Sequence, residues 1–386
     1  MILVVIWSAG SGMRSTIGFA LAAVLMGAGP ANAQAPAPAS RAEIEALRTR
    51  PFAWTDALET RGDAGPAEVK TNITSTPLRQ AWIDTFADVV KRSYTPYGAL
   101  PQAFRNIAPR RAGMDEYRPI EYGVTFVMQD PTIKAGKITR SPIPSSTLIY
   151  AYANSLSSAE PAWEFNRPDK LYFTSRFFPD GAMVDPEERA KDAPEAATVK
   201  RAVGRDCIVM SANGGWAVWL IPGGRLPFVS VTIGEAIDAA EAGLKRRQAG
   251  KEPFDPGTYA ARMAGIARAR AVHARELNRP AFVRDYQFDS HSFQGGDWTP
   301  FQPSINRVMW PLYTVDPTAY AKAASGQPAW LVFGFPRLKY NNMPRDQALY
   351  DAMTRRLDWS SLYDAVFAPG ATPASAKAAY RPRATN

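Results

Sequence analysis

Cysteine and histidine are nearly absent from this chain of 386 residues. Cys207 is the only cysteine, so no disulfide can form within the chain and iron–sulfur ligation is excluded. The two histidines, His273 and His291, are too few for a three-histidine metal centre, and neither C-x-x-C nor H-E-x-x-H occurs. We therefore expect no cofactor and no zinc site, whereas calcium held by scattered carboxylates needs no linear motif and stays open. An ordinary hydrophobic core must stabilise the fold.

The common linear motifs of catalysis are also missing. The chain has neither G-x-x-x-x-G-K-[ST] nor G-x-G-x-x-G, which excludes the usual phosphate-binding loops. It also lacks G-x-S-x-G and S-x-x-K, two motifs that contain a nucleophilic serine. Cys207 lies in the apolar segment GRDCIVMSA, which predicts a buried, unreactive thiol. No signature in the sequence fixes a reaction.

Charge is unbalanced but spread out. The formal net charge is +9 at pH 7, and the basic clusters are as short as Arg110–Arg111 and Lys245–Arg247. Such a chain favours anionic partners in a general way, for example an anionic envelope component, a glycan, or the acidic surface of another protein. A nucleic-acid partner is not expected, because no long basic stripe is present.

Long apolar runs are confined to the start of the chain. From Met13 the sequence reads MRSTIGFALAAVLMGAGPANAQ, with Arg14 before an apolar run and the small-residue site Ala31–Ala33 after it. This pattern predicts a bacterial signal peptide over residues 1–33, cleaved after Ala33, with translation starting at Met13. We expect a periplasmic or secreted protein without a transmembrane segment after cleavage; an N-terminal membrane anchor is the alternative.

Hydrophobic periodicity predicts an α+β fold, with mainly antiparallel sheets, flanking amphipathic helices, and either one domain or two subdomains. Apolar residues recur at helical spacing in 76–94 and 233–248, and also in 346–367, where a break is expected near Asp358. Segments rich in β-branched and aromatic residues predict strands at 121–129, 146–155, 171–178, 206–212, 215–221, 226–232, 301–316 and 328–338. We expect the first three strands to form an antiparallel meander, and the prolines of the last two suit edge positions and bulges.

Changes in composition along the chain indicate where its regions begin and end. Residues 34–50 form a Pro/Ala-rich linker followed by a short helix from Arg41, and residues 51–180 an N-terminal α+β region. The charged stretch 181–200 is expected to be a surface loop or boundary. A second α+β region then spans 201–367, and a polar tail spans 368–386.

The stretch GGWAVWLIPGGRLPFVSVTIGEA, residues 214–236, raises the question of an aromatic binding surface. Trp216 and Trp219 point to opposite faces of the predicted strand, and both faces are apolar. A strand that is apolar on both faces is usually covered on both, which favours core over an exposed platform. Residues 222–225, Pro-Gly-Gly-Arg, predict a hairpin turn, because Gly223 and Gly224 can adopt the positive φ that such turns require. Thr232 with Glu235 predicts a capping box at the next helix.

The helix predicted at 256–279 has a basic side with Arg262, Arg268, Arg275 and Arg279. This side could contact an anionic partner, but a run of charges at this spacing is usually a solvated face, which is the interpretation we favour.

The segment RDYQFDSHSFQGGDW, residues 284–298, holds the densest group of chemically active side chains. Asp289 and His291 share a face if the segment is extended, so the carboxylate could orient the imidazole for general base catalysis. Asp289 and Asp297 could instead form the carboxylate pair of a glycoside hydrolase. An ordinary loop has the same composition.

Two hypotheses follow. The first is an exported, non-catalytic protein that binds an envelope component, a glycan or another protein through loops and aromatic side chains, with Trp216, Trp219 and Trp298 as the binding residues. The second is an exported hydrolase acting on a glycan or ester, with Asp289, His291 and Asp297 as catalytic residues.

Overall fold

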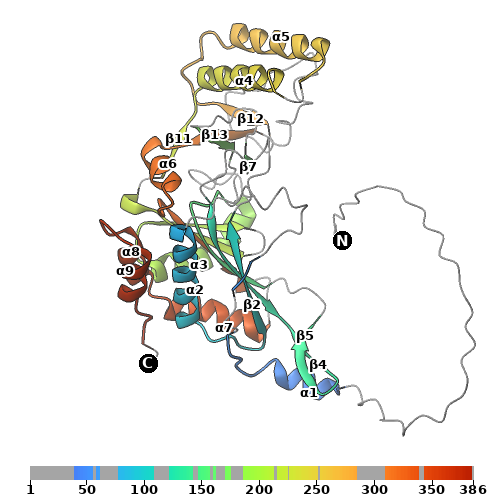
Figure 1. Ribbon diagram of the computed structural model, residues 1–386, viewed down its shortest axis with the longest axis vertical. Helices are drawn as coiled ribbons and strands as arrows, with labels where there is room; N and C mark the ends of the chain where they lie inside the picture. Colours follow the sequence, from blue (N-terminus) through green and yellow to red (C-terminus); the bar gives the residue numbers. More distant parts are fainter. Residues whose placement is uncertain are drawn as a thin grey trace, which may run out of the picture. The chain divides into compact units, whose positions relative to one another are not determined.

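The computed structural model describes residues 39–54, 58–60, 77–107, 121–141, 147–156, 160–161, 170–174, 186–212, 215–224, 226–250, 253–284, 309–338 and 343–384 (Figure 1). They belong to the compact unit Pro38–Asn386 and form helices and mostly antiparallel sheets. The predicted α+β class is confirmed. The predicted signal peptide lies outside the described residues. Among the helices described, none is both long and apolar enough to cross a bilayer.

A seven-stranded sheet forms the centre of this unit. In spatial order its strands are β1 (Leu58–Thr60), β2 (Leu100–Ile107), β3 (Tyr122–Gln129), β6 (Leu148–Ala153), β14 (Leu331–Pro336), β10 (Gly215–Leu220) and β9 (Cys207–Ala212). All neighbours pair antiparallel except β1 and β2, which run parallel. Strand β14 lies between β6 and β10, so its predicted edge position is wrong. Pro336 is the last residue of β14 and leaves its interior free to pair on both sides.

One face of the seven-stranded sheet is covered by helices. Helix α2 (Pro77–Ser93), predicted over 76–94, buries Trp82 and Phe86 in one core with side chains of β3 and β14, and the Phe86 ring stacks on Tyr122 of β3 at 6.4 Å. Helices α8 (Trp359–Phe367) and α9 (Pro373–Ala379) complete this core, which is the largest of the described unit. Short elements lie beside it: α1 (Arg41–Leu47), as predicted, and the hairpin β4 (Pro131–Lys134) with β5 (Lys137–Arg140).

The charged stretch 181–200 is not a loop where it is described. Residues Pro186–Val203 form helix α3, which contains Pro194. Between Lys191 and Val203 a few side chains are buried, among them Val199 and Val203 in the first core, and most of the others are exposed. The stretch resembles a loop in composition because most of these side chains face solvent and because a proline usually interrupts a helix.

A second sheet contains β11 (Phe228–Ser230), β13 (Met309–Val315), β8 (Tyr172–Thr174) and β7 (Glu160–Pro161), and β12 (Phe282–Arg284) also pairs with β13. Two predictions are therefore wrong. Strand β8 does not continue a meander from β6, although β3 and β6 pair antiparallel as expected. Gly223 and Gly224 have the predicted positive φ, but the chain passes there from one sheet to the other, because β10 pairs with β9 and β14 while β11 pairs with β13.

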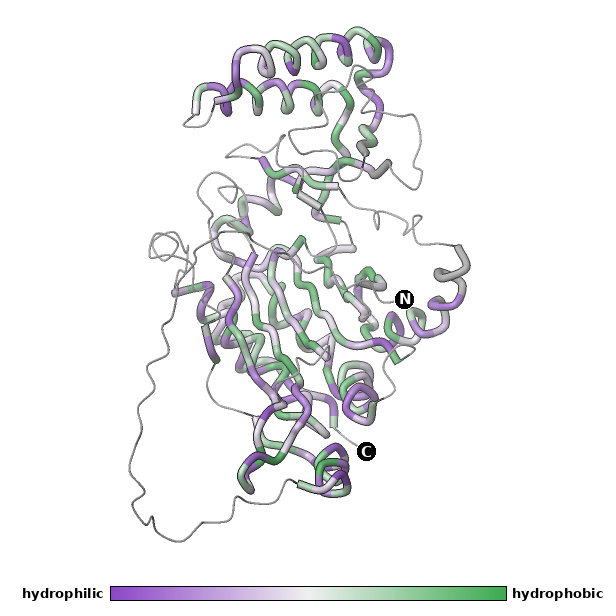
Figure 2. The backbone as a smooth tube through the Cα atoms, turned by 90° about the vertical axis from the view of Figure 1, so that its right-hand side faces the viewer, coloured by the Kyte–Doolittle hydropathy of each residue, from purple (hydrophilic) through white to green (hydrophobic). Residues whose placement is uncertain are grey.

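Two helices, α4 (Ile233–Gln248) and α5 (Pro256–Val272), pack together over a separate small core. Figure 2 shows hydrophobic and hydrophilic residues alternating along both, as expected for helices with one buried side. Thr232 caps α4 by accepting from the Glu235 amide at 3.2 Å. The other half of the predicted capping box is absent from the bonds described here, since the Glu235 carboxylate binds Lys170 and the Tyr172 hydroxyl.

Helix α5 ends at Val272, earlier than predicted, and its basic side is not uniformly solvated. Arg262 is 2% exposed, and its guanidinium carbon lies 3.9 Å from the centre of the Phe254 ring. This cation–π contact explains how a charged side chain is accommodated against the α4–α5 core. Arg268 is exposed, as expected.

The chain closes with α6 (Pro317–Ala324), α7 (Pro344–Asp351), the π-helical segment Ala352–Arg356, and α8. The predicted break near Asp358 is confirmed, because this residue caps α8 by accepting from the Ser361 amide at 3.0 Å. The predicted polar tail is wrong. Residues 373–379 form α9, and Tyr380 is completely buried beneath α2 and α8.

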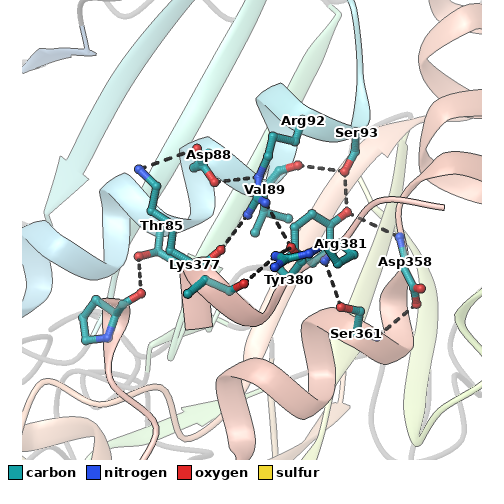
Figure 3. Close-up of polar contacts among 12 residues, drawn as sticks. Thr85, Asp88, Val89, Arg92, Ser93, Asp358, Ser361, Lys377, Tyr380 and Arg381 are labelled. Carbon is teal, nitrogen blue, oxygen red and sulfur yellow. Dashed lines mark hydrogen bonds and ion pairs between the residues drawn. The ribbon is translucent and has the colours of Figure 1, made fainter. Parts of the chain in front are cut away.

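Polar contacts fasten this C-terminal segment to α2 (Figure 3). The Tyr380 hydroxyl pairs with Ser93 Oγ at 2.5 Å, and Arg92 donates to the carbonyls of Tyr380 and Lys377 at 3.0 and 2.9 Å. Thr85 donates to the Pro373 carbonyl at 3.1 Å. Residues after α8 are thus part of the folded core.

Candidate functional site

The residues predicted from sequence do not form a described site. Asp289, His291, Asp297 and Trp298 all lie outside the described residues. The hydrolase hypothesis, which depends on the first three, stays a prediction. Within the part of the chain that is described, no group of three or more His, Cys, Asp or Glu side chains is arranged to hold a metal ion.

Trp216 and Trp219 are core residues. Their exposed fractions are 2% and 0%. The Trp216 indole nitrogen donates to Glu195 Oε1 at 2.6 Å, and the ring of Trp219 packs edge-on against Phe228 at 5.8 Å. The interpretation of their strand as core is confirmed, and the alternative of an exposed binding platform is corrected for these two side chains.

A different aromatic pair lies on the same sheet. Tyr150 and Tyr152 of β6 point to the face opposite the helix-covered core, since Ile149 and Ala151 between them are fully buried in that core. Both tyrosines are only partly buried. Their ring centres are 5.3 Å apart, with an interplanar angle of 27°.

Two glycines make room for these rings. Tyr150 is paired across the sheet with Gly334 of β14, and Tyr152 with Gly123 of β3. A Cβ atom at Gly334 would overlap the ring of Tyr150, and one at Gly123 would overlap the ring of Tyr152. Each ring therefore lies across a neighbouring strand with one edge or face against glycine backbone, a known way in which aromatic side chains cover strand glycines.

Hydrogen bonds fix the second ring. The Tyr152 hydroxyl pairs with Thr125 Oγ1 and accepts from Asn106 Nδ2 at 3.0 Å. Asn106 Nδ2 also donates to Thr125 Oγ1 at 2.8 Å. These bonds use the amide nitrogen of Asn106 and leave its amide oxygen able to accept from another partner.

We call Tyr150, Tyr152, Gly123, Gly334 and Asn106 the tyrosine platform. Leu148, which is 40% exposed, borders it on the same strand. The platform was missed from sequence. The signal was present in LIYAYA, where strict alternation places both tyrosines on one face, but the glycine partners come from strands far away in the sequence.

The chain matches no family model, and neither the curated proteins nor the solved structures contain a significant match to it. The site is therefore interpreted from its own geometry.

Proposed function

We propose that the protein is an exported, non-catalytic glycan-binding protein, and that a sugar ring stacks on the tyrosine platform. One observation supports the proposal above all others: two tyrosine rings are seated over glycine backbone on an incompletely covered sheet face, with an amide oxygen beside them.

The chemistry of the platform suits a sugar. The face of an aromatic ring carries partial negative charge, and the C–H groups on the flatter side of a pyranose carry partial positive charge, so the two surfaces attract and exclude water between them. The hydroxyl groups at the edge of the sugar need hydrogen-bond partners. The Asn106 amide oxygen supplies a polar group of the required kind.

Preorganisation strengthens the argument. Tyr152 is held by its hydroxyl bonds and by its seat on Gly123, so little side-chain freedom remains to be lost when a ligand binds. The net charge of +9 and the predicted signal peptide favour an anionic glycan of the cell envelope over a neutral cytoplasmic one.

The test is calorimetric titration of the purified protein with soluble oligosaccharides, neutral and acidic. Tyr150→Ala and Tyr152→Ala are each expected to weaken binding by roughly 2- to 10-fold, the equivalent of one aromatic stacking contact. Tyr150→Phe keeps the ring and should change affinity less than Tyr150→Ala does. Tyr259→Ala, which alters a half-buried tyrosine of α5, is the matched control and should leave the affinity unchanged.

Binding that survives the Tyr150→Ala/Tyr152→Ala double variant would contradict the proposed site, and a lack of binding across the panel would contradict the proposed function. The oligosaccharide should be recovered intact after incubation. Cleavage that disappears in Asp289→Asn would favour the hydrolase hypothesis instead.

A further inference from the structure

A cleft unrelated to the tyrosine platform lies beside the π-helical segment Ala352–Arg356. Its volume is about 520 Å³, within the range of sites that take small molecules. Charged side chains in its lining are Asp351, Arg355 and Arg356, and small apolar residues such as Ala348 and Ala352 line the same space. The cleft therefore combines positively and negatively charged side chains with an apolar surface.

The local fold produces this arrangement. The π-helical turn closes with the Leu357 amide donating to the Ala352 carbonyl at 2.8 Å, five residues back. Such turns are rare, and they occur frequently at functional sites. The buried Tyr380 anchors the chain that follows α9 (Figure 3), so that the Arg383 amide donates to the Arg356 carbonyl at 2.9 Å and Ala384 joins the lining.

The two arginines present cationic donors to the cleft. Arg356 lines the cleft, and its buried Nε has no hydrogen-bond partner within the described part of the chain, so the guanidinium group is not committed to an acceptor at that nitrogen. The Arg355 side chain is 79% exposed, and its Nε lies 3.6 Å from Asp351 Oδ1. A carboxylate is the natural partner of such guanidinium groups, because it accepts two parallel hydrogen bonds.

Asp351 supplies the opposite charge. Its carboxylate is 37% exposed, and it accepts from Gln347 Nε2 at 3.2 Å in addition to facing Arg355. An ammonium group entering the cleft would find this carboxylate as its partner. The charges in the lining therefore match a molecule that carries both a carboxylate and an ammonium group.

A neutral donor completes the lining. The Tyr94 hydroxyl accepts from the Tyr97 amide at 3.1 Å, which leaves its own hydrogen to donate. Burial raises the pKa of Tyr94 to about 12, so the phenol is protonated throughout the physiological range. A protonated phenol can donate to a ligand oxygen but cannot repel an anion.

We infer that the cleft binds a zwitterionic amino acid or short peptide, with its carboxylate at Arg356, its ammonium group at Asp351, and small side chains against Ala348 and Ala352. This inference is independent of the proposed glycan site, since the two share no residue. It assigns the chain a second ligand, of defined charge and small size.

The experiment is a titration of the full chain with alanyl-alanine, N-acetyl-alanyl-alanine and alanyl-alanine amide. Binding is measured by calorimetry and by the shift in the melting temperature of the protein. The unmodified dipeptide should bind best. Removing either terminal charge should weaken binding by roughly 10- to 100-fold, the effect of losing a hydrogen bond to a charged group. Arg356→Gln should weaken the binding of the two ligands that keep a carboxylate, alanyl-alanine and N-acetyl-alanyl-alanine, whereas Arg268→Gln, on the exposed side of α5, should have no effect.

Asp351→Asn provides the sharpest test. It should weaken the unmodified dipeptide but leave the N-acetyl derivative unchanged, because that ligand has no ammonium group for Asp351 to bind. Unchanged melting temperatures of the Arg356→Gln and Asp351→Asn proteins without ligand would show that both fold. Equal binding of inorganic phosphate and the dipeptide would overturn the zwitterion assignment, and no binding of the dipeptide at about 10 mM would overturn the site.

Discussion

Replacing Tyr380 by alanine tests whether the C-terminal segment belongs to the core. Tyr380 is fully buried and packs in the first core, and the Arg92 guanidinium lies 5.0 Å from its ring centre. Its hydroxyl pairs with Ser93 at 2.5 Å and accepts from the Asp358 amide at 3.4 Å. Loss of so large a buried ring is expected to reduce the free energy of unfolding by about 3–5 kcal/mol.

Tyr380→Phe separates the hydroxyl from the ring. Phenylalanine keeps the packing, and Ser93 Oγ retains its bond to the Val89 carbonyl at 2.7 Å, so the side chain of Ser93 is not left without a partner. We expect this variant to lose only about 0.5–1.5 kcal/mol, the usual net value of a hydrogen bond. The ring should thus account for most of the effect of Tyr380→Ala.

Urea denaturation followed by circular dichroism measures both changes. Lys377→Ala is the matched control, since this α9 side chain is 55% exposed and its ion pair with Asp88, at 3.6 Å, should contribute at most about 1 kcal/mol. If Tyr380→Ala cost no more than Lys377→Ala, residues after α8 would be a loosely attached tail, and the docking described above would be refuted.

Three further predictions concern other parts of the molecule. At Gly334 the three atoms nearest to an added Cβ all belong to the Tyr150 ring, so Gly334→Ala should displace that ring and reduce glycan affinity. At Gly123 the nearest atoms include backbone, so Gly123→Ala should destabilise the fold more, as denaturation of both variants can show. The pKa of Tyr94 is raised from 10.0 to about 12, so its contribution to the free energy of unfolding is complete below pH 10 and is lost as the pH rises towards 12. At about pH 11 the free energy of unfolding of the wild type should have fallen by about 1.4 kcal/mol more than that of Tyr94→Phe. Equal losses for the two proteins in urea titrations would contradict this. Cys207 is partly buried against the first core, which raises the pKa of its thiol to about 11, so alkylation at pH 8 should be roughly 100-fold slower in the folded protein than in urea; comparable rates would contradict this raised pKa.

Local signals in the sequence predicted many of the elements correctly. The apolar spacing in 76–94 and 233–248 yields α2 and α4 within a residue or two, and Asp358 marks the break before α8. These features depend on periodicity and on capping residues, whose effects act within one or two turns of a helix. The α+β class follows from the same local patterns.

The wrong predictions share a different cause. Positive φ at Gly223 and Gly224 was correctly inferred, but a turn does not specify which strands pair after it, and the chain there enters another sheet. Helix α3 and helix α9 are poor in large apolar residues because each is mostly exposed and attaches through a few anchors, such as Val203 for α3 and Tyr380 after α9. The burial of such anchoring residues cannot be predicted locally, because the residues that cover them are distant in the sequence.

The candidate site shows the same dependence on long-range pairing. Aromatic content alone pointed to Trp216 and Trp219, yet both faces of β10 are covered, so neither ring is available to a ligand. What leaves room for Tyr150 and Tyr152 is the absence of side chains at their cross-strand partners, and that absence can be recognised only once the register of β6 against β3 and β14 is known. Tyr150 also packs against the second hydrophobic core, and Tyr152 is held by Thr125 and Asn106, so both rings are fixed in place while part of their surface stays accessible, and this combination is what a stacking ligand requires.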